Sequence, residues 1–422
     1  MRVLVVGGGG REHALAWAIA RSPKVERILA APGNPGIVAL GETHDVAADD
    51  LEGLLTLVER ERVDLTVVGP EAPLVAGLVD ALEARGHRAF GPTREAARLE
   101  GSKAWSRELC ERHGIPGPRT GVFEDLDSAA AHLESLEAPY VIKADGLAAG
   151  KGVAVVETRE EALAALRERL VDGAFGEAGA RVLVEEHLTG QEVSAIALTD
   201  GETVLPLMLA QDFKRALDGD AGPNTGGMGA YSPVPFVDDR LHDEIVALLE
   251  ETLAALTAEG VTYRGVLYAG LMLTDAGPKV LEYNARFGDP ETQAILPRVA
   301  SDLLEALAAC TEGTLAGYRL EAYRDACVTV VLASGGYPGA YETGKPIEGL
   351  DAVADLDGVV AFHAGTALET GRVVTAGGRV LAISALGADL VAARRRAYEA
   401  CELVTFPGRH LRTDIAKEAD DG

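Results

Sequence analysis

A glycine-rich loop with two lysines is the first group whose residue types and spacing could do chemistry. The stretch IKADGLAAGKGVAVV, residues 142–156, joins two apolar runs and carries Lys143 and Lys151. Glycine amides and lysine ammonium groups together suit phosphate oxygens. The stretch departs from the loop G-x-x-x-x-G-K-[ST], because Gly152 replaces the hydroxyl residue and a strand-like run follows. It predicts either a strand-to-strand cover over phosphate or an ordinary glycine hairpin.

A carboxylate, an amide and a guanidinium recur at strand spacing in VLEYNARFGDPET, residues 280–292. Side chains at i, i+2 and i+4 of a strand share one face, so Glu282, Asn284 and Arg286 point the same way. Carboxylate and amide oxygens suit magnesium, and arginine can bind a carboxylate or phosphate through two hydrogen bonds. The trio predicts a metal and anion site, with an exposed polar strand face as the alternative.

Three glutamates follow a third apolar run in VLVEEHLTGQE, residues 182–192. A strand that carries Glu185, Glu186 and then Glu192 can offer backbone groups to an adenine and a carboxylate to a ribose. Acidic pairs more often simply face solvent, so this stretch is informative only together with the other two.

The N-terminal glycines in VVGGGGREHALAWAIA resemble the dinucleotide fingerprint G-x-G-x-x-G, but Glu12 occupies the third glycine position. The second strand ends at APGNPG and lacks the acidic residue that binds a ribose diol. An NAD-dependent oxidoreductase is therefore disfavoured. The loop predicts either a small phosphorylated ligand at a helix N-terminus, within reach of Arg11 and Glu12, or a tight turn without a ligand.

Alternating strand and helix patterns must position these groups. Residues 1 to about 90 alternate β-branched runs with helical patterns, which predicts a parallel α/β layer. Residues 120–187 form a compact lobe, and residues 188–310 add paired strands, a helix from Asp239 and the loop DGDAGPNTGGMGAYSPVP. Short strands and a closing helix end the chain. A length of 422 residues is consistent with about three domains.

Charge and cysteine usage exclude several classes of protein. The 39 basic and 66 acidic residues give 39 − 66 = −27, which argues against nonspecific binding to nucleic acid or anionic membranes. The four cysteines, Cys110, Cys310, Cys327 and Cys401, are too dispersed for a zinc site or a disulfide framework. The sequence has no signal-like N-terminus and no run of about 18 apolar residues. We expect a cytoplasmic protein with no membrane or nucleic-acid partner.

The order of these groups resembles the ATP-grasp superfamily, in which two lobes hold ATP and a glycine-rich hairpin covers its phosphates. The motifs GGREHALAW, APGNPG, VVGPEAPLVAGLVD, EGSK, KADGLAAGKGV, GPNTGGMGAYSP and RFGDPE together resemble one family within it, the phosphoribosylamine-glycine ligases, also called glycinamide ribonucleotide synthetases. The resemblance covers residues 1 to about 410. It implies a multidomain α/β fold: a Rossmann-like domain (1–100), a two-lobed ATP-grasp domain (101–315, mobile lobe about 120–187) and a small mixed domain (325–422).

The resemblance implies the joining of glycine to 5-phosphoribosylamine at the expense of ATP in purine synthesis. The products are glycinamide ribonucleotide, ADP and phosphate, and the intermediate is glycyl phosphate. It also implies magnesium or manganese as the metal and a monomer or weak homodimer. The wider superfamily often has a further metal-binding glutamate on the preceding strand. Here that strand reads LYAGLML, so only one metal site, at Glu282 and Asn284, is implied.

The resemblance also assigns roles to individual residues. The implied ATP-binding residues are Lys103, Lys143, Gly150, Lys151, Glu185, Glu186, Leu188 and Glu192, and the implied catalytic residues are Arg286, Lys151 and Asp212. The implied substrate-binding residues are Gly9, Gly10, Arg11, Asn34, Gly69, Pro70, Glu71, Asp212, Lys214, Asn224, Gly227, Arg286, Pro290 and Glu291. Two alternatives stay open: a different ATP-grasp ligase, such as a formate-using or carboxylating purine enzyme, and a nucleotide-binding module without activity.

Overall fold

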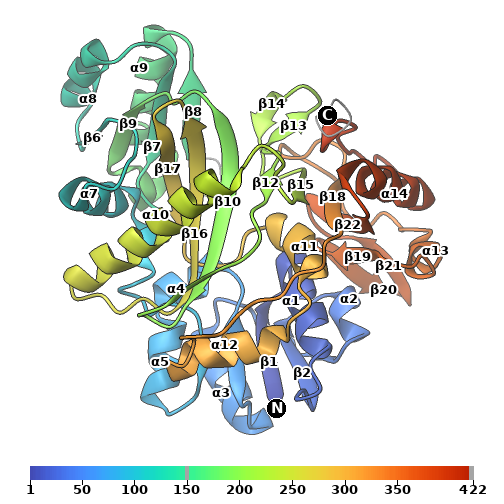
Figure 1. Cartoon of the computed structure of the whole chain (residues 1–422). Helices are drawn as coiled ribbons and strands as arrows, with labels where there is room; N and C mark the ends of the chain where they lie inside the picture. Colours follow the sequence, from blue (N-terminus) through green and yellow to red (C-terminus); the bar gives the residue numbers. More distant parts are fainter. Residues whose placement is uncertain (148–151, 418–422) are drawn as a thin grey trace.

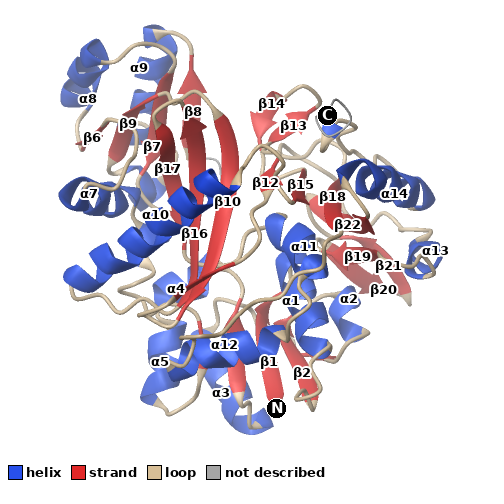
Figure 2. Cartoon of the chain, in the orientation of Figure 1, coloured by secondary structure: helices blue, strands red, loops and turns tan. Residues whose placement is uncertain are grey.

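The computed structural model describes residues 1–147 and 152–417. Figure 1 shows an N-terminal sheet with its helices at the bottom, antiparallel strands at the upper left and the C-terminal strands at the right. Figure 2 shows helices around these sheets and, near the centre, helices between the N-terminal sheet and the C-terminal strands. The arrangement confirms the expected multidomain α/β fold with a parallel N-terminal sheet.

The N-terminal sheet has the strand order β3-β2-β1-β4-β5, and every pair in it is parallel. The central strand β1 is buried along nearly its whole length, as a parallel strand covered on both faces must be. Its strands are β1 Arg2–Gly7, β2 Arg27–Pro32, β3 Glu42–Thr43, β4 Leu65–Val68 and β5 Ala89–Phe90. Its helices are α1 Gly10–Ala20, α2 Pro35–Val38, α3 Leu51–Glu61, α4 Glu71–Ala76, α5 Leu78–Ala84 and α6 Arg98–Gly101.

The next lobe is an antiparallel sheet of order β6-β9-β7-β8 that is packed against helices. Strands β7 and β8 pair with Lys143 opposite Val153, so the glycine-rich stretch does join two strands, as expected. The strands are β6 Thr120–Phe123, β7 Tyr140–Ala144, β8 Val153–Val156 and β9 Val182–Glu186. The helices are α7 Lys103–His113, α8 Leu126–His132 and α9 Arg159–Leu170, with 3-10 turns at Leu133–Ser135 and Gly176–Gly179.

A second antiparallel sheet has the order β11-β10-β16-β17, and residues of this sheet and of the lobe line a common cavity. Its strands are β10 Gln191–Thr199, β11 Val204–Pro206, β16 Gly265–Thr274 and β17 Gly277–Asn284. The 20-residue helix α10, Asp239–Ala258, packs its apolar face on this sheet, and the Asp238 side chain caps its first turn. This helix lies where the sequence predicts it.

The C-terminal sheet crosses the boundary that the sequence suggests between residues 315 and 325. Its order is β12-β15-β18-β22-β19, so two short strands from the preceding segment complete it. The expected loop at 218–235 is wrong in part, because it contains β14 and β15; glycines and prolines hide these strands from a propensity argument. The five strands of this sheet are β12 Gln211–Asp212, β15 Gly229–Ser232, β18 Ala326–Ala333, β19 Val359–His363 and β22 Arg379–Gly387. Two separate two-stranded sheets contain β13 Arg215–Leu217 with β14 Ala221–Asn224, and β20 Thr366–Glu369 with β21 Arg372–Thr375. The helices are α11 Glu291–Ile295, α12 Leu303–Glu312, α13 Leu350–Ala354 and α14 Leu390–Leu403, with a 3-10 turn at Leu296–Arg298.

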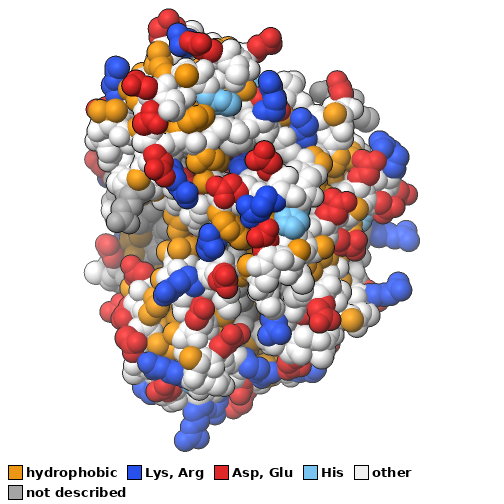
Figure 3. All heavy atoms as spheres, turned by 90° about the vertical axis from the view of Figure 1, so that its left-hand side faces the viewer, with side chains coloured by type: hydrophobic (Ala, Val, Ile, Leu, Met, Phe, Trp, Pro, Cys, Tyr) orange, Lys and Arg blue, Asp and Glu red, His pale blue; other side chains and the backbone are white. Residues whose placement is uncertain are grey.

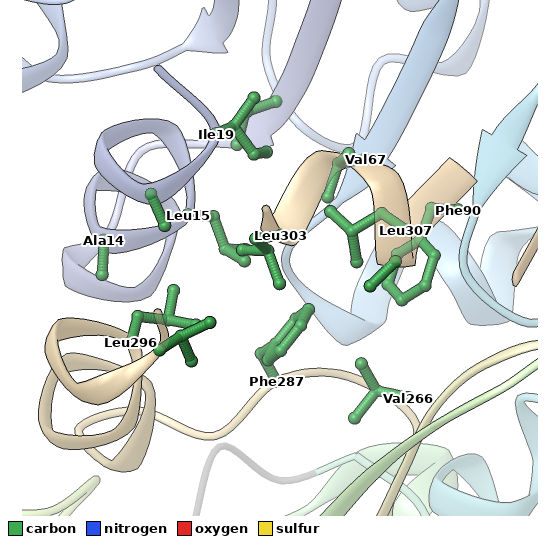
Figure 4. Close-up of a cluster of buried hydrophobic side chains, with 14 of the residues drawn as sticks. Ala14, Leu15, Ile19, Val67, Phe90, Val266, Phe287, Leu296, Leu303 and Leu307 are labelled. Atoms are coloured by element: carbon green, nitrogen blue, oxygen red, sulfur yellow. The ribbon is translucent and has the colours of Figure 1, made fainter. Parts of the chain in front are cut away.

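One apolar core joins the N-terminal sheet to later parts of the chain (Figure 4). Leu15 and Ile19 of α1 and Phe90 of β5 lie in the same cluster as Phe287 and Leu303, which follow β17. Burial of such side chains stabilises the contact by about 1.5–3 kcal/mol each. The end of β17, which carries the expected metal ligands, is therefore anchored to the N-terminal domain.

The surface carries both signs of charge despite the net charge of −27. On the face in Figure 3, Asp and Glu side chains are interspersed with Lys and Arg side chains. No helix among residues 1–147 and 152–417 is long and apolar enough to span a membrane.

Candidate active site

A cavity of about 900 Å³ lies between the lobe sheet, the β10–β17 sheet and the C-terminal sheet. Charged side chains from all three parts line it. Among the residues that the sequence singles out, those that line it are Arg11, Pro70, Glu71, Lys103, Lys143, Glu185, Glu186, Leu188, Glu192, Asp212, Lys214, Asn224, Glu282, Asn284, Arg286 and Glu291. The structure thus gathers residues that are up to 280 positions apart in the chain.

Lys143, near the end of β7, is held by a buried ion pair. Its Nζ lies 2.7 Å from Glu185 Oε2 on β9 and donates to the Leu281 carbonyl at 2.9 Å. Arg107 of α7 binds the other oxygen of Glu185 at 2.7 Å. Burial by itself raises the pKa of Glu185. The charges of Lys143 and Arg107 outweigh this effect and lower the pKa to about 2. Glu185 therefore fixes the lysine and has no free oxygen for a ribose.

A β-bulge lies in β17 directly before Glu282. Gly270 pairs with Glu282 while Leu271 pairs with Val280, so Leu281 is the extra residue. Arg107 and Lys143 both donate to the Leu281 carbonyl. Bulges re-aim side chains beside active sites. Here the bulge places Glu282 and Asn284 on the cavity wall, next to the lysine that faces the same space.

Glu282 and Asn284 fit a divalent metal that is also bound by phosphate oxygens. Both are hard oxygen donors on the cavity wall. Within residues 1–147 and 152–417, no group of three or more His, Cys, Asp or Glu side chains could hold a metal by itself. A metal with one or two protein ligands that completes its shell from substrate phosphates suits magnesium-type chemistry.

Arg286 is held between two glutamates at the junction with the N-terminal domain. Its Nη2 lies 3.1 Å from Glu100 Oε1 and its Nε lies 3.4 Å from Glu71 Oε2. Although burial lowers the pKa of Arg286, the charges of Glu100 and Glu71 raise it overall. Burial raises the pKa of Glu100 itself. The guanidinium is thus a fixed cation on the cavity wall, placed to bind an anionic group.

Asp212 and Lys214 form a second ion-pair cluster on the cavity wall. Lys214 Nζ lies 3.0 Å from Asp212 Oδ1 and also binds Glu192. Burial and the negative charges of Glu291 and Glu192 raise the pKa of Asp212, and the positive charge of Lys214 lowers it. The net result is a pKa of about 7. A carboxylate with this pKa can exchange a proton near neutral pH.

Lys103 lies at the start of α7, beside the end of β7. Its Nζ donates to the Gly146 carbonyl at 2.8 Å, and burial lowers its pKa. Asp145 fixes this corner, because its carboxylate accepts from the backbone of Ala104 at 3.0 Å and from the Ser102 hydroxyl. The expected lysine pair, Lys103 and Lys143, therefore faces the same cavity.

The glycine-rich start of α1 is filled by the protein's own carboxylates. Glu12 accepts from the Gly9 amide at 2.7 Å and from Arg11 Nε. Asp289 accepts from the Arg11 backbone, and Gln293 Nε2 lies close enough that a Cβ at Gly10 would be 2.6 Å from it. These contacts occupy the anion-binding end of the helix.

Asn34 acts as a tether in this region. Its Nδ2 donates to the Gly8 carbonyl at 2.9 Å and to the His363 carbonyl at 2.8 Å, while its Oδ1 caps α2. Six of the residues expected to bind substrate are not among those that line the cavity: Gly9, Gly10, Asn34, Gly69, Gly227 and Pro290. From residues 1–100, the cavity is lined by Arg11, Pro70, Glu71, Leu99 and Glu100. Gly150 and Lys151 lie outside the described residues.

Family models match nearly the whole chain. The models for the N domain, the ATP-grasp (A) domain and the C domain of phosphoribosylglycinamide synthetase match residues 1–100, 101–292 and 327–418. Phosphoribosylamine–glycine ligase of Caulobacter vibrioides is 52% identical over 422 residues, which cover 99% of this chain and 98% of that protein. The chain belongs to the phosphoribosylglycinamide synthetase family.

Further relatives agree with this family. Phosphoribosylamine–glycine ligase of Allochromatium vinosum is 50% identical over 423 residues, covering 99% of both chains. The crystal structure of phosphoribosylamine–glycine ligase from Thermotoga maritima matches with a TM-score of 0.85 and 36% identity, over 98% of this chain and 100% of that one. A biotin carboxylase domain from Hydrogenobacter thermophilus, 17% identical with a TM-score of 0.75 over 97% of this chain and 91% of that one, shares the fold.

Within this synthetase family fold, sequence reasoning misses several residues of the cavity. Arg107 and Glu100 are buried partners of the expected residues, and Tyr337 and Arg379 reach the cavity from the C-terminal domain. Arg107 sits in a charged helix with no distinctive spacing. Arg379 lies about 150 residues from Gly226, whose carbonyl it binds at 2.6 Å. Two quoted motifs gave a signal: EGSK contains Glu100, and GPNTGGMGAYSP contains Gly226, but neither indicated the partner.

Proposed function

We propose that the chain joins glycine to 5-phosphoribosylamine with cleavage of ATP to ADP and phosphate, giving glycinamide ribonucleotide in purine biosynthesis. The printed names of relatives that are 49–52% identical over nearly the whole chain support this activity. The observation that carries the proposal is the convergence of Lys103 and Lys143 with Glu282 and Asn284 on one cavity. Two cations and two hard oxygen donors suit the triphosphate of ATP.

The first step transfers the γ-phosphoryl group to glycine. A glycine carboxylate oxygen attacks the γ-phosphorus, the bond to the β,γ-bridging oxygen breaks, and ADP leaves. Lys103 and Lys143 neutralise phosphate charge, and Arg286 holds the carboxylate in line. Phosphoryl transfer depends mainly on positioning and charge stabilisation, so fixed cations suffice. The product of this step is glycyl phosphate.

The second step forms the amide. The amine nitrogen of phosphoribosylamine attacks the carbonyl carbon of glycyl phosphate, the carbon–oxygen bond to phosphate breaks, and the nitrogen loses a proton. Asp212, with its pKa raised to about 7 by burial, can accept that proton, while Lys214 stays cationic beside it. Arg11, Pro70, Glu71 and Asn224, which line the cavity, are the proposed contacts of phosphoribosylamine.

Glu282 and Asn284 would hold the divalent metal, which we propose to be magnesium; it would neutralise phosphate charge during transfer. Glu186, Leu188 and Glu192, at the hinge between the lobes, are the proposed contacts of the nucleoside. We further propose domains at 1–100, 101–315 and 325–422, a cytoplasmic location and a monomer or weak homodimer. The four buried, unpaired cysteines support a reducing compartment.

Product analysis with labelled glycine tests the activity and its intermediate together. The purified chain with ATP, magnesium, phosphoribosylamine and glycine labelled with ¹⁸O in its carboxylate should release ADP and glycinamide ribonucleotide in equal amounts. One ¹⁸O should appear in phosphate, because the attacking carboxylate oxygen leaves with it. Absence of ADP release would exclude the activity, and unlabelled phosphate would exclude glycyl phosphate. Omission of glycine provides the control.

A further inference from the structure

A small hairpin on the cavity wall depends on the end of the chain. Strands β13 and β14 form a sheet of only two strands, placed in Figure 1 between the β10–β17 sheet and the C-terminal strands. An isolated two-stranded hairpin is marginally stable in water. Yet Arg215, Asp220 and Asn224 of this hairpin line the cavity. Contacts outside the hairpin must therefore fix its position.

Arg412 provides the central contact. Its side chain is only 1% exposed and is the largest of the fully buried side chains among the described residues. Its guanidinium binds Asp414 through two hydrogen bonds of 2.7 and 2.8 Å, Asp220 at 2.7 Å and the Arg215 carbonyl at 3.2 Å. A planar guanidinium can satisfy this set of acceptors at once, whereas a lysine cannot.

The same guanidinium packs over the ring of Phe213, 4.9 Å from its centroid. Phe213 lies between Asp212 and Lys214, the ion pair on the cavity wall. A guanidinium over the face of an aromatic ring is attracted by the ring and fixes its position. Arg412 thus contacts both the hairpin and the residue that separates the two charged side chains.

Residues near Arg412, in the segment 410–414, form further hydrogen bonds along the hairpin. The Thr413 backbone donates to Asp218 at 2.7 Å, Asp414 accepts from the Gly219 amide at 2.7 Å, and His410 Nε2 contacts the Ala216 carbonyl at 2.8 Å. The segment therefore follows the hairpin from its first strand to its turn.

We propose that Arg412 is a positioning residue for substrate binding: through Asp220, the Arg215 carbonyl and Phe213 it holds Asp212, Lys214 and Asn224 in place on the cavity wall. The proposal rests on the proposed function for its kinetic consequence only. Arg412 itself does not line the cavity and has no part in the chemical steps. It gives the end of the C-terminal domain a role in the reaction that is distinct from general stability.

The C-terminal domain also holds the chain that leaves the hairpin. The Tyr337 hydroxyl accepts from the Gly226 amide at 3.0 Å, and Arg379 donates to the Gly226 carbonyl at 2.6 Å. The segment from Phe213 to Gly226 is thus fastened at both ends. Loss of Arg412 frees one end only, so the hairpin should loosen without detaching.

Hydrogen–deuterium exchange of Arg412→Lys provides the primary test, because it does not depend on activity. We expect amides of residues 215–224 to exchange at least about tenfold faster than in the parent chain. Arg396→Lys is the matched control: Arg396 also donates to backbone carbonyls of the C-terminal domain, but those carbonyls belong to Leu386 and Asp357 and not to the hairpin. Its exchange in 215–224 should match the parent.

Kinetics provide the second readout. With Arg412→Lys, the KM values for glycine and phosphoribosylamine should rise about tenfold, with kcat reduced less than about threefold. Asp218→Asn weakens the exposed hydrogen bonds to Thr413 and disturbs no buried charge. It should increase both the exchange rate and the KM values by a smaller factor. This variant provides the test if Arg412→Lys fails to fold. Unchanged exchange in 215–224 in all variants would overturn the proposal. Faster exchange with unchanged KM values would overturn its link to substrate binding, and inactivity of the parent chain would instead refute the proposed function.

Discussion

The start of α1 and the cavity wall around β7 and β17 both combine glycines with charged side chains, but they differ in how far the protein's own side chains occupy the groups that could bind an anion. At α1 the amides of the glycine loop are bound by Glu12 and Asp289, and Gln293 covers the helix start. Around the cavity, Lys103 and Lys143 are each anchored by one or two protein groups while they face open space.

The difference teaches how to read a glycine-rich motif. Glycines indicate that the backbone approaches something closely, without indicating what it approaches. At α1 it approaches the protein's own side chains, and the loop serves as a junction between domains. On the cavity wall, fixed cations without a full set of internal acceptors mark the ligand site.

Glu282→Gln should have the largest effect of the substitutions that test the difference between the two regions. The amide keeps the shape of the side chain but removes the negative charge that would hold the metal. We expect kcat to fall at least about 100-fold, or about 3 kcal/mol of transition-state stabilisation. The unfolding midpoint should stay close to that of the parent chain. Initial rates of ADP release across a magnesium titration measure the effect.

Glu134→Gln supplies the matched control for Glu282. Glu134 forms an exposed ion pair with Arg159 on the lobe, away from the cavity. Exposed pairs contribute about 0–1 kcal/mol, so activity and stability should both stay near the parent values. An active Glu282→Gln enzyme with unchanged magnesium dependence would remove Glu282 from the metal site.

Asn34→Ala tests the junction side of the comparison. The change removes the donors to the Gly8 and His363 carbonyls and the cap of α2. Buried acceptors left without partners and a lost helix cap should lower the free energy of unfolding by about 2–4 kcal/mol. Chemical denaturation measures this loss. The dissociation constant for an ATP analogue should stay within about threefold of the parent value.

Asn34→Asp separates the two functions of this side chain. The carboxylate keeps an acceptor for the amides of Gly36 and Ile37 but replaces the donor that faces two carbonyls. We expect most of the destabilisation to persist, because the tether and not the cap is lost. A stable Asn34→Ala chain with weakened phosphoribosylamine binding would instead make Asn34 a substrate contact.

The sequence predicts the residues that line the cavity better than the residues that hold them in place. Strand alternation places Glu282 and Asn284 on one face of β17, and both side chains line the cavity. Arg286 also lines the cavity, but the expectation that it lies on the same strand is wrong, because β17 ends at Asn284. The pairing of β7 with β8 also follows from two apolar runs around a glycine loop. These inferences use residues within about fifteen positions of one another, where periodicity is informative.

The residues that hold the cavity wall in place act through contacts between distant parts of the chain, which local sequence patterns do not encode. Arg107 binds Glu185 across 78 positions, and Arg412 binds Asp220 across 192. The C-terminal sheet recruits β15, although glycine and proline flank it, because pairing with β18 overrides local propensity. Tertiary partners of this kind become visible only when the sheets are assembled.

The junction at α1 also predicts a pH dependence of stability, the smallest of the expected effects near neutral pH. Burial, with the nearby charge of His363, lowers the pKa of His13 from 6.5 to about 3, and burial lowers the pKa of His363 to about 4. Below pH 6.5 the unfolded chain binds protons that the folded chain does not. Stability is therefore full above pH 6.5 and decreases as the pH falls toward 4, by about 2 kcal/mol between pH 7 and 5.5 for the pair.

His13→Asn isolates this effect from the titration of carboxylates. The His363 amide donates to His13 Nδ1 at 2.8 Å, and an asparagine oxygen can accept the same hydrogen bond without titrating. The difference in unfolding free energy between pH 7 and 5.5 should therefore shrink by about 1 kcal/mol relative to the parent chain. A variant that keeps the full pH dependence would show that folding does not shift the pKa of His13. The imidazole would then carry a charge in the folded chain below about pH 6.5, and the contrast between the two regions would fail.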